Sequence, residues 1–245
     1  MRRLFAWCVF QTYKRFCDDF FENDPLASAE AGGFETFLHG CGFHTLDISP
    51  CADGRLAHVI RYVLRLPYRA VRRKSYAGAM FDIEDSLAKW TETELLRFRE
   101  GRPNTADAPT RYLKAVVYHY SSVDPDHEGC AAHGSDATRA AQAGLDRLLS
   151  FQRAVQNSYC CGASIDLLLI GLDTDTDAIR VHVPDANGEI NLLGFLDARE
   201  LYDRSRHMTA GESQAYIDER VRRTADVTRG MARRVARLRK HNVPQ

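Results

Sequence analysis

The sequence predicts an α/β fold: a mostly parallel sheet of four to five strands flanked by helices, with helical extensions at the N- and C-terminal ends. Segments with strand patterns alternate with segments of helical periodicity, which is the order that parallel βαβ units require. Residues 164–172 are continuously apolar, as is typical of a strand covered on both faces. Residues 211–240 form a long basic stretch of helical pattern, which predicts a helix beyond the sheet.

The N-terminal half contains the first two predicted strands. Apolar residues at helical spacing over 3–22 predict a helix that ends before Pro25, because proline disfavours helical geometry in the residue preceding it. The elements expected next are a linker with a short helix at 25–40, a strand at 44–49, a helix at 52–66 and a strand at 68–76. A first βαβ unit therefore lies within residues 44–76.

The same alternation continues through the C-terminal half. The expected elements are a helix at 83–100, a strand at 112–120, a helix at 137–157, and strands at 164–172 and 178–184. Ser135 or Asp136 can cap the second of these helices, because a side-chain oxygen there accepts hydrogen bonds from free backbone amides. The Asp/Thr-rich residues 173–177 can join the last two strands as a hairpin.

These elements divide the chain into an N-terminal helical arm at 1–33, a central α/β domain at 34–205 and a basic C-terminal helix at 206–245. Nine Lys and Arg residues lie between Arg220 and Lys240. Two interpretations stay open for them: a solvated amphipathic helix, or a helix that docks on an acidic partner.

The composition excludes several classes of protein. Lys plus Arg and Asp plus Glu both total 33, so the formal charge is zero and a nucleic-acid-binding role is not expected. No apolar segment has the ~20 residues that span a bilayer, and the apolar run 4–10 lacks the features of a secretory signal. We expect a protein of the cytoplasm, whose seven cysteines are thiols or metal ligands.

Chemically reactive side chains follow two of the predicted strands. Cys51 follows the strand at 44–49 after one intervening proline, His119 closes the strand at 112–120, and Cys130 follows that strand. The carboxyl ends of parallel strands meet at one edge of a sheet, where ligands gather. Two thiolates and an imidazole are donors that zinc prefers, and three protein ligands leave a fourth position for water. The alternative is a set of buried structural cysteines.

Asp53 and Arg55 lie two and four residues after Cys51. A carboxylate at this spacing can accept a hydrogen bond from water at the metal, and an arginine can hold that carboxylate through two parallel bonds. As isolated residues they would also suit the alternative of a turn aspartate and a solvated arginine at a helix start.

The sequence CADGR (51–55) resembles the Cys-x-Asp-x-Arg signature of β-class carbonic anhydrases. SPCADGRLAH (49–58) and YHYSSVDPDHEGCAAHGSD (118–136) are similar to the carboxysome shell carbonic anhydrases, the divergent subclass once called epsilon. The resemblance implies a β-carbonic anhydrase-like domain that holds one Zn²⁺ per chain through Cys51, His119 and Cys130. It implies Asp53 and Arg55 as the catalytic pair and reversible hydration of carbon dioxide to bicarbonate as the reaction.

The sequence offers two candidates for the histidine ligand, His119 and His127. His127-Glu-Gly-Cys130 spells the His-x-x-Cys of ordinary β-class enzymes, whereas His119 closes the strand where those enzymes place the ligand. His119 is the preferred ligand, with 120–127 as an inserted loop. His127 or His133 could then pass protons to buffer.

The chain is shorter than carboxysomal members of that family, which have additional N- and C-terminal domains. From the resemblance we expect a short form that assembles as a homodimer or higher homo-oligomer, in the cytoplasm or in a carboxysome, with a carboxysome protein as a candidate partner for the basic helix. Hydrolysis of carbonyl sulfide or carbon disulfide, or a non-catalytic scaffold role, are the alternatives.

Overall fold

A computed structural model describes residues 44–56, 71–102, 112–158, 165–176, 178–185 and 187–241. The helix expected at 3–22, the linker at 25–40 and most of the helix expected at 52–66 lie outside these residues. The elements are, in chain order, β1 (Thr45–Pro50), η1 (Gly54–Leu56), β2 (Val71–Arg73), η2 (Ala77–Ala79), α4 (Ile83–Arg99), β3 (Tyr112–Tyr120), η3 (Ala131–His133), α5 (Ala137–Ser158), β4 (Ile165–Asp173), β5 (Ile179–Pro184), β6 (Ile190–Asp197), α6 (Ala198–Ser205) and α7 (Ala210–His241).

The strands form one mixed sheet in the order β2-β1-β3-β4-β5-β6. β2, β1, β3 and β4 are parallel, and β5 and β6 continue the sheet as antiparallel strands. All nine residues of β3 are buried, which makes this strand the centre of the core. The α/β fold with a mostly parallel sheet is thus confirmed, and β4–β5 is the expected hairpin.

The expectation of four to five strands was too low, because β6 was not predicted. Its sequence, INLLGFLD, contains a glycine and no clean alternation. The local signal was the Asn187-Gly188 turn before it, a dipeptide that favours hairpins. There the Asp185 amide donates to the Glu189 carbonyl at 2.7 Å and the Gly188 amide to the Asp185 carbonyl at 3.0 Å.

Two helices begin at aspartate caps. The Asp82 carboxylate accepts hydrogen bonds from the amides of Glu84 and Asp85 at the start of α4. Of the two caps considered for α5, Asp136 is the one that accepts bonds, from the amides of Thr138 and Arg139. Such caps satisfy backbone donors that the first helical turn leaves free.

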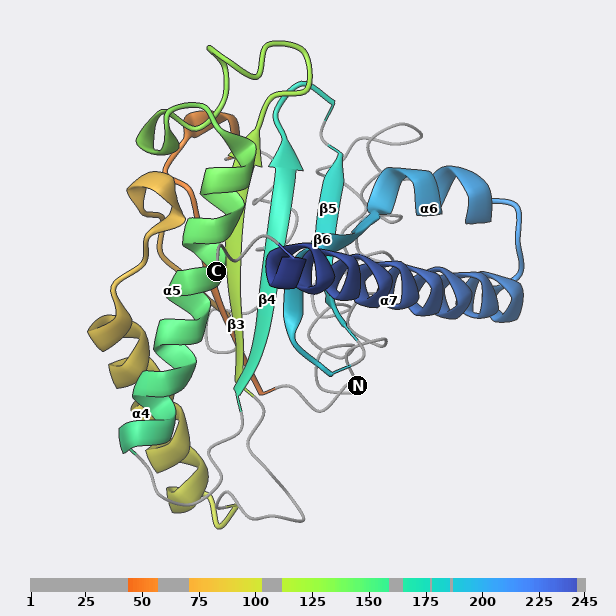
Figure 1. The fold of residues 1–245 in the computed structure, drawn as a ribbon. Helices are drawn as coiled ribbons and strands as arrows, with labels where there is room; N and C mark the ends of the chain where they lie inside the picture. The colour runs from red at the N-terminus through yellow and green to blue at the C-terminus, as the bar shows by residue number, and fades with distance from the viewer. Residues whose placement is uncertain are drawn as a thin grey trace, which may run out of the picture.

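Helices cover both faces of the sheet. Gly144 of α5 lies against Val116 and Leu169, and its missing side chain allows this approach, since a Cβ would lie 3.0 Å from Leu169 Cδ1. On the opposite face a second cluster consists of Val183, Leu196, Leu201, Ile217 and Val221, from β5, β6, α6 and α7. Figure 1 shows α4 and α5 along one side of the sheet and α6 and α7 toward the other. The first half of α7 therefore packs on the α/β domain.

A buried ion pair joins β1 to β3 beneath α4 and α5. Lys114 Nζ donates to Asp47 Oδ2, Ser49 Oγ and Ser86 Oγ at 2.8 to 2.9 Å, and the Lys114 and Asp47 side chains are fully buried. Tyr112 Oη donates to the same Asp47 oxygen at 2.7 Å. Within the described residues, no helix combines the length and the apolar character needed to cross a bilayer.

Candidate metal centre

Cys51, His119 and Cys130 meet at the carboxyl edge of the sheet. β1 and β3 are parallel neighbours, with Pro50 opposite Val117, so the residue after β1 and the penultimate residue of β3 lie at the same edge. The loop after β3 returns Cys130 to this point. One donor atom from each of the three side chains lies within 4.8 Å of the others, and all three residues are buried.

The donor set fits a tetrahedral metal ion. Cys51 Sγ and Cys130 Sγ are 3.8 Å apart. Two sulfurs bound to zinc at ~2.3 Å on adjacent corners of a tetrahedron would lie about 3.8 Å apart. Both ring nitrogens of His119 are buried and make no hydrogen bond with the described residues. Buried polar atoms normally have a partner, so this imidazole has the surroundings of a metal ligand.

Hydrogen bonding between the two thiols separates their proton affinities. The bond from Cys130 lowers the pKa of Cys51 to about 4, with further help from His119 and against the effect of burial. The same bond and burial raise the pKa of Cys130 well above its ordinary value. One sulfur of the pair is therefore already a thiolate, which is the form that binds metals.

Asp53 and Arg55 form a closed pair beside the three donors. The Arg55 backbone amide and Nε both donate to Asp53 Oδ1, at 2.9 and 3.0 Å, and Nη2 donates to Oδ2 at 2.8 Å. These bonds lower the pKa of Asp53 to about 2, so the carboxylate is ionised at neutral pH. Asp53 Oδ2 also lies 3.3 Å from His119 Nε2, which directs this oxygen toward the cluster.

Backbone hydrogen bonds fix the position of Cys51. Its amide donates to the Val117 carbonyl at 2.9 Å, which continues the pairing of β1 with β3. On the other side a single bridge pairs Cys51 with Tyr76, through bonds from the Ala52 amide to Tyr76 and from the Tyr76 amide to Pro50. Cys51 is thus held between β3 and the segment that follows β2 rather than in a free loop.

The β4–β5 turn holds the loop that carries Cys130. Asp175 Oδ2 accepts hydrogen bonds from Ser121 Oγ and from the amides of Ser122 and Val123, at 2.7 to 3.0 Å. Asp173 Oδ1 accepts a further bond from Ser122 at 3.2 Å. Sequence reasoning interpreted 173–177 only as a hairpin turn and missed this role. Its only local signal was the repeated aspartates.

Gly129 and Gly78 allow close packing around the same loop. A Cβ on Gly129 would lie 2.4 Å from the Ser135 carbonyl oxygen, so no larger residue fits directly before Cys130. Gly78 has a φ of +61°, and a Cβ at this position would lie 2.7 Å from His133 Nε2. His133 Nε2 lies 2.9 Å from the Gly78 carbonyl, to which it can donate, and this bond ties η3 to η2.

His127 is not part of the three-residue group. Its side chain is 82% exposed, and Nδ1 lies 2.9 Å from Asp124 Oδ1. The Asp124 carboxylate raises the pKa of His127 above its ordinary value. Of the two histidines left open by the sequence, His119 is the one with a ring nitrogen within 4.8 Å of both sulfurs.

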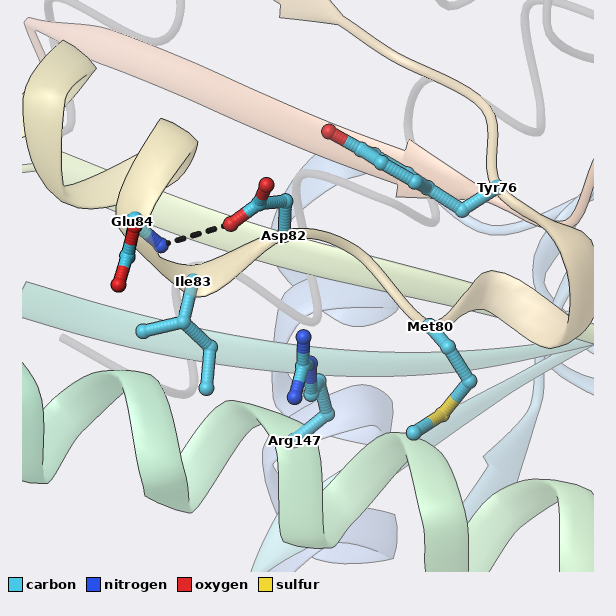
Figure 2. Close-up of a pocket in the computed structure, with 6 residues that line it drawn as sticks. All are labelled: Tyr76, Met80, Asp82, Ile83, Glu84 and Arg147. Atoms are coloured by element: carbon cyan, nitrogen blue, oxygen red, sulfur yellow. Dashed lines mark hydrogen bonds between the residues drawn. The ribbon is translucent and has the colours of Figure 1, made fainter.

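An open hollow of about 540 Å³ lies beside this region, at the start of α4. Figure 2 shows Arg147 of α5 pointing toward it between Ile83 and Met80, with Tyr76 above. Its lining residues are Tyr76, Met80, Asp82, Ile83, Glu84 and Arg147. The hollow includes none of the three metal donors.

Comparison with known proteins places the chain in a family. Residues 33–245 match the family model described as carboxysome shell carbonic anhydrase, catalytic domain. The chain is 60% identical over 225 residues to a carboxysome shell carbonic anhydrase of Prochlorococcus marinus, which covers 90% of this chain and 44% of that relative. The relative from Halothiobacillus neapolitanus is 55% identical over 201 residues, covering 82% of this chain and 38% of the relative.

Among solved structures, a β-carbonic anhydrase of Trichomonas vaginalis aligns at TM-score 0.30 and 10% identity, over 60% of this chain and 91% of that one. A β-carbonic anhydrase of Aspergillus fumigatus aligns at TM-score 0.29 and 11% identity, over 83% of this chain and 96% of that one. The chain spans less than half the length of the curated relatives it matches. From the match over residues 33–245, the chain belongs to the family of carboxysome shell carbonic anhydrase catalytic domains.

Proposed function

We propose that this chain catalyses the reversible hydration of carbon dioxide to bicarbonate at one zinc ion held by Cys51, His119 and Cys130. The observation that carries the proposal is the convergence of these three buried donors, from two strand ends and a loop, beside an ionised Asp53. Membership of a family of carbonic anhydrase catalytic domains supports the same reaction.

Two thiolates and one imidazole favour zinc over harder cations, which prefer oxygen donors. With three protein ligands, a bound ion would supply Lewis-acid activation of water, which would lower the pKa of that water toward neutrality. One zinc per chain follows from the single cluster of this kind among the described residues.

Asp53 contributes a hydrogen-bond acceptor in a fixed orientation. Arg55 donates two hydrogen bonds to Asp53 Oδ1 and one to Asp53 Oδ2. The side of Oδ2 nearest His119 is left to accept a hydrogen bond from the reacting water. With a pKa of about 2, Asp53 stays ionised and orients the water rather than storing its proton. Arg55 also keeps Asp53 from turning both oxygens toward the metal.

The setting of the reaction is part of the proposal. The relatives are named carboxysome shell carbonic anhydrases, and we infer that this chain also works in a carboxysome, as a homodimer or higher homo-oligomer. After Thr228 every described side chain of α7 is exposed through residue 237, including Arg229, Arg233, Arg234 and Arg237. This basic end offers a docking site for an acidic carboxysome protein.

Stopped-flow measurement of carbon dioxide hydration, together with zinc quantification on the same sample, tests the reaction. The expected result is one zinc per chain and hydration that a chelator abolishes and added zinc restores. If the zinc-loaded protein is inactive with carbon dioxide but hydrolyses carbonyl sulfide or carbon disulfide, that molecule replaces carbon dioxide as the proposed substrate. Protein without zinc and without either activity would indicate a scaffold.

A further inference from the structure

We propose that Glu128 is a positioning residue for the Asp53–Arg55 pair, acting through the outer edge of the Arg55 guanidinium. The inference rests on the proposed function, since it concerns the orientation of Asp53 at the same site. Arg55 Nη1 donates to Glu128 Oε2 at 2.8 Å, across 73 residues of sequence.

The three nitrogens of the guanidinium have two different partners. Nε and Nη2 face Asp53, while Nη1 faces Glu128. A planar group held by carboxylates on two edges cannot swing about its long axis without breaking a bond on one of them. Asp53, whose two oxygens follow the plane of Arg55, is thereby held in the orientation that its role requires.

Glu128 is itself held in place by its own loop. Its backbone amide donates to the Asp124 carbonyl at 2.9 Å, and it lies two residues before Cys130. Asp175 in turn holds the start of this loop through Ser122 and Val123. The contact between Glu128 and Arg55 therefore joins the segment that carries Cys130 to the segment that carries Cys51 and Asp53.

The electrostatics agree with this geometry. The hydrogen bond to Asp53 is the largest cause that raises the pKa of Arg55, and the charges of Glu128 and Asp175 raise it further. Because the Glu128 side chain is 60% exposed and that of Arg55 37% exposed, solvent screens the attraction. The effect of Glu128 is therefore expected in the orientation of the pair more than in the stability of the fold.

The test compares Glu128→Gln with Asp126→Asn in the full chain loaded with zinc. Asp126 is exposed in the same loop, so its variant makes the same change in net charge two residues away. We expect Glu128→Gln to lower kcat about twofold to fivefold, with KM, zinc content and melting temperature unchanged. Asp126→Asn is expected to match the wild type in every measurement.

Two further measurements identify Arg55 as the route. In an Arg55→Ala background, the effect of Glu128→Gln on kcat is expected to disappear, because no guanidinium remains to be held. Nitrogen-15 NMR of the Arg55 side chain is expected to show faster rotation about the Nε–Cζ bond in Glu128→Gln than in Asp126→Asn. This rotation rate is measured independently of turnover.

Equal kcat and equal Arg55 rotation in the two variants would overturn the role of Glu128. A fall in kcat that persists in the Arg55→Ala background would also overturn it, since Glu128 would then act elsewhere. If the wild-type chain does not hydrate carbon dioxide, the proposed function fails, while the rotation rate still decides whether Glu128 restrains Arg55.

Discussion

Cys51 Sγ lies 3.8 Å from Cys130 Sγ, although 79 residues separate the two cysteines in the chain. The hydrogen bond between them lowers the pKa of Cys51, and the contact depends on the parallel pairing of β1 with β3 and on the loop that returns Cys130 to the sheet edge.

Removing any one donor is expected to empty the metal site. Cys51→Ala, His119→Ala and Cys130→Ala should each lower bound zinc from one per chain to near zero, because two remaining ligands do not complete a stable zinc site. His127→Ala is the matched control and should retain full zinc, since that side chain is exposed. Elemental analysis of the purified proteins measures this. Full zinc in His119→Ala with loss in His127→Ala would reverse the assignment.

Asp53→Asn is expected to retain zinc and to lower kcat about 100-fold, because an amide no longer offers the ionised acceptor that Arg55 holds in place. Stopped-flow hydration assays and zinc quantification on one preparation provide both readings. Wild-type turnover in this variant would remove Asp53 from the mechanism.

Gly129→Ala is expected to weaken zinc binding. The new Cβ would lie 2.4 Å from the Ser135 carbonyl oxygen, so the backbone directly before Cys130 must shift. Gly54→Ala is the matched control, because no atom lies within 4 Å of a Cβ at that position. Competition with a zinc chelator measures the two affinities. Equal zinc affinity in both variants would mean that the loop absorbs the added methyl group without moving Cys130.

Stability is expected to fall as the pH falls from about 6.5 toward 4, in part through His182. Burial lowers the pKa of this histidine from 6.5 to about 4, while Nε2 lies 2.8 Å from Tyr118 Oη, which can donate to it. In this window the unfolded chain binds a proton that the folded chain does not, at a cost of up to about 1.4 kcal/mol per pH unit. Above pH 6.5 the stabilisation is fully present.

Urea unfolding at several pH values measures this slope. His182→Gln should flatten it, whereas His127→Gln, which replaces an exposed histidine, should leave the loss toward pH 4 in place. The same slope in wild type and His182→Gln would show that other groups cause the acid sensitivity.

Lys114→Met is expected to destabilise the fold by up to roughly 3–5 kcal/mol, because it removes the closer cation of the buried Asp47 carboxylate and leaves only Arg72 Nη1, at 3.4 Å, to compensate its charge. Adding Asp47→Asn should recover part of that loss, since the amide carries no charge to compensate. The free energies of unfolding of the two single variants and the double variant give the coupling. Strictly additive losses would show that the pair contributes no mutual stabilisation.

Much of the fold could be predicted from the sequence because its signals are local. The helix expected at 83–100 is α4, at Ile83–Arg99, and the strand expected at 112–120 is β3 to the residue. The contact of Asp53 with Arg55 could also be predicted, because both residues lie within one short turn. Family membership followed from two motifs that the match over 33–245 confirms.

The tertiary structure decided what depends on residues far apart in the chain. Spacing alone left His119 and His127 open, whereas the pairing of β1 with β3 brings only the ring of His119 beside the sulfurs of Cys51 and Cys130. The contacts of Glu128 with Arg55 and of Asp175 with Ser122 cross 73 and 53 residues. Strand register and loop path set such contacts, and neither is encoded in the pattern of neighbouring residues.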